Sequence, residues 1–198
     1  MALIDRVKAI LLTPATEWQV IDGEATTPGQ LYAGYIAPLA AIGPIAGVIG
    51  FSVFGFRVPF TGTVWRVPIG TALAGAVVRY VLTLIAVYVL ALIIDALAPT
   101  FDGTKSQMQA LKVAAYSSTA SWVAGIFAVL PALSVLGILG LYSIYLLYLG
   151  LPVLMKAPKE KAMGYTVVVI LAGIVLFMII GAVAGRFVGM PMGGMMGR

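Results

Sequence analysis

The chain has 198 residues, of which 62% are hydrophobic and only 10% are charged, against about 25% charged residues in a soluble domain. Its mean hydropathy of +1.08 indicates a multi-span membrane protein, because a soluble domain of this length could not bury so much apolar surface. The sequence contains no cysteine and no histidine, which excludes disulfides, thiolate or zinc sites, and Ser-His-Asp or Cys-His catalysis. The net charge of +5 comes from Lys and Arg at the ends of apolar runs. This pattern is typical of membrane topology and argues against nucleic-acid binding.

Residues 1–30 are predicted to form a cytoplasmic or interfacial segment before the first span. The apolar side chains between Leu3 and Leu11 fall on one face of a helix that is too short to cross a bilayer. We expect this amphipathic helix to lie in the headgroup plane on the cytoplasmic side, with packing on a soluble partner as the alternative. A second short helix begins at Pro14, and its Trp18 suits a membrane interface. The charged side chains expected off the apolar face of the first helix are Asp5, Arg6 and Lys8.

Residues 31–188 are predicted to be an all-α, polytopic membrane domain of five transmembrane helices. Pro38 and Pro44 should kink the first helix, because proline removes a backbone hydrogen bond and clashes with the preceding turn. Glycines four residues apart, at 43 and 47 and again at 181 and 185, permit close helix contact. The expected spans are Thr27 to Phe56, Ile69 to Leu97, Leu111 to Leu130, Ala132 to Met155, and Met163 to Val188.

Residues 189–198 are expected to form a flexible tail rich in methionine and glycine. Thioether sulfurs are soft ligands that can hold Cu(I). No histidine or cysteine supports them here, so a flexible tail without a ligand is the preferred interpretation. The sequence therefore predicts neither a metal nor a cofactor site.

Two charges lie within the predicted second span, Arg79 and Asp95. They are about 24 Å apart along the helix axis and cannot pair with each other. Charged groups inside a membrane are costly and usually paired or functional. Arg79 shares a face with small residues and should turn inward, or alternatively extend toward the headgroups. For Asp95 we expect an ion pair with Lys105, Lys112 or the basic turn at 156–161.

Hydroxyl groups mark the third and fourth spans. Lys112 and Tyr116 begin a polar stripe whose hydroxyls could bond across helices or line a wet crevice. In the fourth span, Tyr142, Tyr145 and Tyr148 recur at steps of three residues and predict an inward stripe. No further motif accompanies these tyrosines, so a cofactor site is not expected. The candidate functional polar residues are Arg79, Asp95, Lys112, Tyr116, Tyr142 and Tyr145.

The distribution of basic residues predicts the orientation. With Arg79 left out, seven Lys and Arg fall on one side and four on the other. The side with seven holds the N-terminus, the central loop with Lys105 and Lys112, and the last turn at 156–161. Cytoplasmic segments carry the excess of Lys and Arg, so the N-terminus should be cytoplasmic. The face that shares this side, with Asp95 and Lys112, is where we expect the function.

Five segments carry a resemblance to a known family: Pro99–Gly103, Gln109–Lys112, Tyr116-Ser117, Leu141–Pro152, and Lys161 ahead of Tyr165. In these segments the sequence resembles the Yip (Ypt-interacting protein) family of five-span membrane proteins, in its short bacterial form. The resemblance covers about Tyr32 to Ile180 and implies a Yip-type membrane domain, here in a bacterial inner membrane. Eukaryotic members of the family assemble with each other and contact Rab-type GTPases through a long N-terminal region. Only about thirty residues precede the first span here, so GTPase binding is not predicted.

Three functions are compatible with these observations. The first is a non-enzymatic scaffold that organises partners or lipids in the membrane, as a homo-oligomer or with other membrane proteins. The alternative is an oligomeric channel or transporter for a small solute, ion or lipid, lined by Arg79 and the tyrosines. An intramembrane enzyme is the least favoured, because Asp95 alone supplies no facing acid and base.

Overall fold

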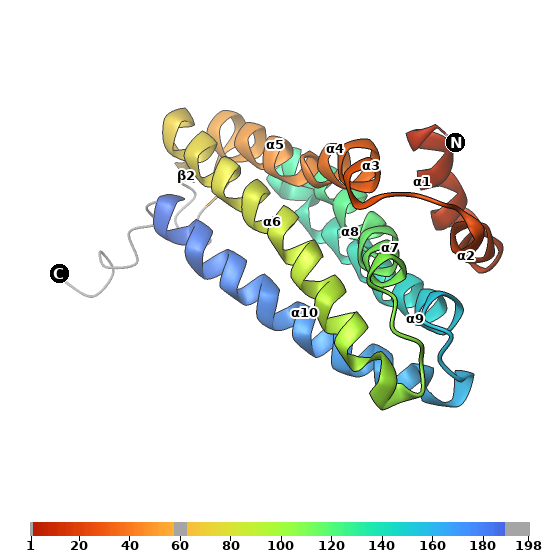
Figure 1. Cartoon of the computed structure of the whole chain (residues 1–198). Coiled ribbons are helices and arrows are strands. Elements are labelled where there is room, and N and C mark those ends of the chain that lie inside the picture. Colours follow the sequence, from red (N-terminus) through yellow and green to blue (C-terminus); the bar gives the residue numbers. More distant parts are fainter. Residues whose placement is uncertain (1, 58–62, 189–198) are drawn as a thin grey trace.

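The computed structural model describes residues 2–57 and 63–188 and shows an all-α bundle (Figure 1). Four helices in this described part are long and apolar enough to cross a membrane: Pro28–Phe54, Ile69–Phe101, Ala132–Leu154 and Lys159–Arg186. The elements are α1 (Leu3–Leu12), α2 (Pro14–Gly23), α3 (Pro28–Leu31), η1 (Tyr32–Ile36), α4 (Ala37–Ala40), α5 (Ile42–Ile49), η2 (Gly50–Phe54), β1 (Phe56–Arg57), β2 (Val64–Trp65), α6 (Ile69–Leu97), η3 (Ala98–Phe101), α7 (Gln107–Ser117), α8 (Thr119–Ala124), η4 (Gly125–Val129), η5 (Pro131–Leu141), α9 (Tyr142–Leu154) and α10 (Lys159–Val188).

The outer surface of the bundle is apolar. On α6, side chains four residues apart form an exposed stripe, and α10 exposes a similar set that includes Phe177. An apolar stripe along a whole helix is unfavourable in water but suits lipid. The predicted multi-pass membrane fold is therefore confirmed. The exposed stripe of α6 consists of Ile69, Leu73, Val77, Val81 and Ile85.

The first span is irregular around its two prolines. A π-helical stretch, η1, precedes Pro38, and a turn at Ala41 separates α4 from α5 just before Pro44. Each proline lacks the N–H that would continue the regular helical ladder. After η2, the short strands β1 and β2 pair antiparallel where a loop was expected. This end of the bundle is called the β end below.

The predicted third span is broken into α7, α8 and η4, so it is not among the four continuous helices. Ser118 lies in the break, where its hydroxyl donates to the Ala114 carbonyl. Such hydroxyls compete with the backbone for hydrogen bonds and weaken a helix interior. The broken segment still runs along the bundle, because Ala128 of η4 contacts Gly50 at the β end. The broken segment thus follows the path that was expected of the third span.

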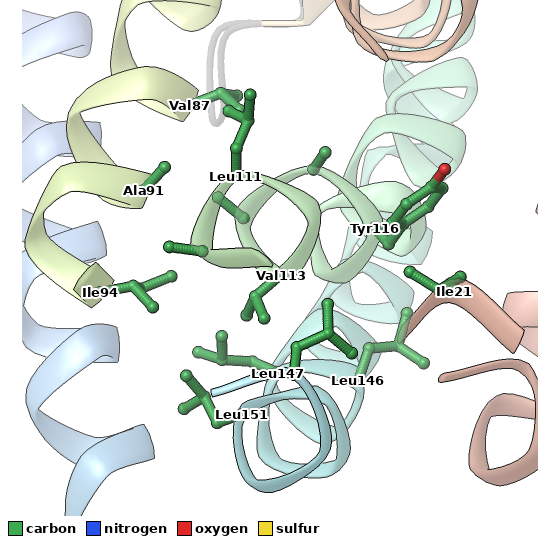
Figure 2. Packing of buried hydrophobic residues seen from close by; sticks show 14 of the residues in the cluster. Ile21, Val87, Ala91, Ile94, Leu111, Val113, Tyr116, Leu146, Leu147 and Leu151 are labelled. Atoms are coloured by element: carbon green, nitrogen blue, oxygen red, sulfur yellow. The ribbon is translucent and has the colours of Figure 1, made fainter. Parts of the chain in front are cut away.

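The core of the protein surrounds α7, whose residues Ala110 to Ser117 are all buried. Figure 2 shows Leu111 and Val113 of α7 among Val87, Ala91 and Ile94 of α6, and Leu146, Leu147 and Leu151 of α9. Ile21 of α2 lies on the opposite side of α7 from α6. A broken helix is thus the central element of the fold, and continuous helices cover it on the lipid side.

The helical hairpin formed by α1 and α2, called the N-terminal hairpin below, packs on the bundle. Ile10, Trp18 and Ile21 are fully buried in the common core. The prediction that Trp18 lies at a membrane interface is therefore wrong. Trp18 packs against Gly150 of α9, where an added Cβ would lie 2.6 Å from the indole ring.

Arg6 was expected off the apolar face of α1 and is instead 5% exposed. It lies one helical turn before the buried Ile10, so both side chains face the bundle. Ile4 and Leu12, by contrast, are exposed. The rest of the predicted apolar face packs on the core, so the buried face of α1 departs from its hydrophobic pattern at Arg6 and Ile4.

The two glycine pairs differ in their surroundings. Gly43 contacts the backbone of Gly125 in η4, as close helix contact requires. At Gly181 and Gly185 an added Cβ would meet nothing within 4 Å, so these glycines make no close contact within the described chain. The methionine-rich tail at 189–198 lies outside the described residues.

Candidate functional site

A buried ionic cluster of Arg6, Glu17 and Glu24 lies within the N-terminal hairpin and the residue that follows it. The Arg6 guanidinium forms ion pairs with Glu17 of α2 and with Glu24, which follows α2. The side chains of Arg6 and Glu17 are only 6% and 7% exposed, whereas that of Glu24 is 40% exposed. Two carboxylates on one guanidinium satisfy its planar array of donors. The hairpin is thus closed on itself by charge.

The Arg6 guanidinium stays charged in this environment. Burial disfavours its charged form, but the hydrogen bond with Glu24 and the charges of Glu24 and Glu17 outweigh that effect. The pKa of Arg6 therefore lies above its ordinary value. Its guanidinium carbon also lies 5.8 Å from the centroid of the Tyr116 ring, within the range of a cation–π contact.

Tyr116 connects the hairpin to the first span through a group of aromatic rings. Its ring meets Trp18 edge-on at 6.3 Å and Tyr35 in a tilted arrangement at 4.6 Å. The Tyr35 hydroxyl and the Thr119 hydroxyl share a hydrogen bond of 2.7 Å. The prediction that hydroxyls of this segment bond across helices holds for Thr119.

Lys112 binds the C-terminal end of α2. Its ammonium donates to the carbonyls of Ile21 at 2.8 Å and Glu24 at 2.6 Å. Carbonyls at the end of a helix lack partners and carry partial negative charge, so a cation there is favourable. Gln109, one turn earlier on α7, donates to the carbonyl and carboxylate of Asp22. Together, two residues of α7 fix the end of the hairpin.

The connecting loops at this end of the bundle carry further charge pairs. Lys156 pairs with Asp22 at 2.5 Å, and Lys161 pairs with Asp102. The Thr104 amide donates to the Met155 carbonyl at 2.7 Å, which joins the two loops. We call this end the polar end. The expectation that charged groups gather on one face is consistent with these contacts.

Asp95 does not form the predicted ion pair. Among the described residues, the acids that pair with Lys156 and Lys161 are Asp22 and Asp102, and Lys112 binds backbone carbonyls. Asp95 is half-buried on α6, and its Oδ1 atom is buried without a hydrogen-bond partner in the described structure. The physical reason is position: Asp22 in the last turn of α2 and Asp102 after η3 lie beside these lysines, whereas Asp95 in the last turn of α6 does not.

The predicted tyrosine stripe of the fourth span divides in the structure. Tyr142 is half-buried and donates to the Leu11 carbonyl at 3.1 Å, so it contacts the end of α1. Tyr145 is 47% exposed and touches Tyr142 ring to ring at 5.4 Å. The prediction that Tyr145 faces inward is wrong. The inward positions of α9 are leucines and Gly150, because steps of three residues drift around a helix of 3.6 residues per turn.

Arg79 lies away from the polar end, beside two cavities. The larger, of about 810 Å³, is bounded by α6, α8, η4, η5, α9 and α10, and the smaller is about 260 Å³. Arg79, Phe177 and Ile180 line both. The side chain of Arg79 is exposed as well. Of the six predicted polar residues, Lys112, Tyr116 and Tyr142 contact the N-terminal hairpin.

Arg6, Glu17 and Glu24 were not among the residues predicted for the site. The available signal was the spacing of Arg6 and Ile10 on one helix face, together with three acids in the next twenty residues. The cluster contains no nucleophile with a facing base. No group of three or more His, Cys, Asp or Glu in the described residues could hold a metal ion. Its chemistry is that of attachment, since every charge is used to hold the hairpin.

Comparison with known protein families gives one match. The family model of the Yip1 domain matches residues 8–180. The matched region begins inside α1, so it includes most of the N-terminal hairpin. No curated protein and no solved structure matches the chain.

Proposed function

Because the chain belongs to the Yip1-domain family of membrane proteins, we propose that it is a non-enzymatic scaffold that organises lipids and partner proteins at the polar end of the bundle. The observation that carries this proposal is the way in which the N-terminal hairpin is attached. The ionic cluster closes the hairpin and Lys112 binds it to α7. Its outer side keeps large apolar side chains exposed: Ile4 at 66%, Leu12 at 77% and Val20 at 48%.

A fixed hairpin with an apolar outer side is suited to binding. A loosely tethered helix would have to be ordered on binding, which costs conformational entropy. Here the ionic cluster already orders the hairpin in the folded protein, so binding would not have to order it. Exposed apolar side chains on a surface helix favour insertion at a lipid interface or contact with another protein.

We place the polar end and the N-terminus in the cytoplasm of a bacterial cell, with the protein in the inner membrane. The support is the excess of seven Lys and Arg over four on that side. Topology reporters at the two termini test this placement. Five crossings put the termini on opposite sides, so signals from one compartment would contradict the crossing made by the broken segment. An N-terminal reporter outside the cytoplasm would contradict the orientation.

The experiment for the scaffold role uses the full chain in its native membrane. The double variant Ile4→Ser, Leu12→Ser should fold normally but lose the partners or homo-oligomers recovered by chemical cross-linking. The matched control is Ile69→Ser, which is 63% exposed at the β end. Equal recovery from the double variant and wild type would overturn the proposal, provided that melting temperatures in detergent agree.

An oligomeric channel or transporter is the second candidate, and the break between α7 and α8 favours it. Ser117 and Ser118 lie at this break and line the larger cavity. Interrupted helices beside a cavity occur where transporters bind solutes. Flux through reconstituted vesicles that is abolished by Arg79→Ala would support this function, and a complete lack of flux would support the scaffold.

A further inference from the structure

Arg79 is the only charged residue among the described residues that line either cavity. Its guanidinium makes no ion pair and no hydrogen bond with another described residue. The hydrogen bond at this residue is to its backbone: the Thr83 hydroxyl donates to the Arg79 carbonyl at 2.8 Å. A cation without an internal partner therefore faces a cleft in the membrane domain.

The depth of Arg79 makes this position costly. It lies ten residues after Ile69 and eighteen before Leu97, which is about 15 Å from the start of α6 and about 27 Å from its end. Because a bilayer core is about 30 Å thick, Arg79 lies within it, in the half nearer the β end. A charged group at such depth is usually paired, and its long side chain extends toward the nearer headgroups.

None of the protein's acidic side chains lies at the depth of Arg79. A neighbouring copy in the same orientation therefore cannot supply the missing anion either. The chain has seven acidic residues. Those nearest to Arg79 in sequence are Asp95, about 24 Å along the helix, and Asp102 beyond it. The acids are Asp5, Glu17, Asp22, Glu24, Asp95, Asp102 and Glu160, and they lie in the N-terminal hairpin, the last turn of α6, the central loop and the start of α10.

The walls of the larger cavity identify the ligand class. From Arg79 the cavity extends along α6 to Leu90, a distance of about 16 Å. Beyond Arg79 this wall is apolar except for Thr83, whose hydroxyl donates to the Arg79 carbonyl, and the facing wall on α10 includes Ile170 and Ile174. The other polar groups that line the cavity are neutral serines at 117, 118, 121, 134 and 143. A free anion would lose its hydration without gaining apolar contacts. An anion that carries an acyl chain would pair with Arg79 and also place apolar groups against the apolar wall of the cavity.

We propose that Arg79 binds the phosphate of a phospholipid whose acyl chain lies in the larger cavity. The guanidinium and phosphate form a charge-assisted, bidentate contact in a medium of low dielectric constant. The phosphate belongs to the leaflet nearer the β end, so the acyl chain points toward the bilayer midplane. This inference is independent of the proposed scaffold role, because Arg79 has no contact with the N-terminal hairpin or its ionic cluster.

The first test is native mass spectrometry of the full chain purified in mild detergent. Wild type should retain one phospholipid per chain, and Arg79→Gln should lower the occupancy by about tenfold or more. Arg79→Lys should retain part of it. The matched control is Arg186→Gln, which removes an exposed cation of α10 that does not line either cavity. Equal occupancy in wild type and Arg79→Gln would overturn the proposal.

The second test distinguishes a lipid from free phosphate. Trp122 lines the larger cavity, so a brominated phospholipid should quench its fluorescence in a variant with Trp18→Phe and Trp65→Phe. Unbrominated phosphatidylglycerol should displace the quencher, whereas inorganic phosphate should not. Displacement by inorganic phosphate alone, or quenching unchanged by Arg79→Gln, would overturn the proposal. If the tryptophan variant does not fold, the mass measurement on the native chain still decides.

Discussion

Arg6 in the N-terminal hairpin and Arg79 within α6 differ in how their charge is satisfied. Arg6 is buried between Glu17 and Glu24, so the chain supplies its counter-ions. Arg79 is exposed toward a cleft and has no acid within reach. A buried cation without partners costs several kcal/mol. The comparison teaches that the first charge serves the fold and the second requires something outside the chain.

This difference predicts that substitutions in the ionic cluster and at Arg79 affect different measured quantities. Changes in the ionic cluster should alter the free energy of unfolding, because the partners that remain are buried within the protein. Changes at Arg79 should alter ligand occupancy and leave the unfolding of the lipid-free protein nearly unchanged. Four substitutions test the contrast.

The largest effect is expected for Arg6→Ala, which leaves the buried Glu17 carboxylate without a partner. Removing one member of a buried ion pair costs roughly 3–5 kcal/mol, so unfolding in detergent should shift strongly toward lower denaturant. Lys8→Ala, at an exposed position on the same helix, is the control and should change little. If both variants unfold alike, the ionic cluster does not hold the hairpin. Adding Glu17→Ala to Arg6→Ala should recover part of the lost stability.

A smaller loss is expected for Lys112→Met, which keeps much of the side-chain volume but removes two hydrogen bonds to the end of α2. Charge-assisted hydrogen bonds contribute roughly 1.5–3 kcal/mol each, less in combination. The hairpin should then become accessible to limited proteolysis near Glu24, while the rest of the bundle resists. Lys105→Met, in the central loop, serves as its control. Uniform proteolysis along the chain would contradict a local role.

Gly150→Ala should cost roughly 1–3 kcal/mol, because its new methyl group would overlap the buried Trp18 ring. The fluorescence of Trp18 should shift as the hairpin is displaced. Gly70→Ala adds the same group where nothing lies within 4 Å and should not destabilise the protein. An unchanged melting temperature for Gly150→Ala would show that the hairpin is more loosely packed than described.

The smallest effect on stability is expected for Arg79→Gln, within about 0.5 kcal/mol for the delipidated protein. The side chain is exposed and makes no ion pair among the described residues. Thermal unfolding with and without added phospholipid measures the contrast: lipid should stabilise wild type and not the variant. A large loss of stability without lipid would show that Arg79, like Arg6, serves the stability of the fold, and would remove the distinction between the two arginines.

Much of the membrane domain follows from local sequence. The bounds of α6 are those predicted, because a long apolar run between Pro68 and Pro99 leaves a helix few alternatives. Local pattern also identified α1 and α2. It failed for Arg6 and Trp18, because their burial depends on α7 and α9, more than ninety residues away in the chain. The partner of Asp95 was wrong for the same reason: which acid reaches a lysine depends on how the loops pack.

The last helix also has unequal ends. Near the polar end, α10 is fixed by Lys161 on Asp102 and by Tyr165, which stacks on Phe101 at 4.8 Å and donates to the Ile94 carbonyl. Near the β end it presents Gly181 and Gly185 to open space. Ala184 between them is buried, so this end of α10 packs through fewer side chains but is not free. We therefore expect bilayer thickness to alter the position of α10 beside Arg79 more than its position beside Asp102.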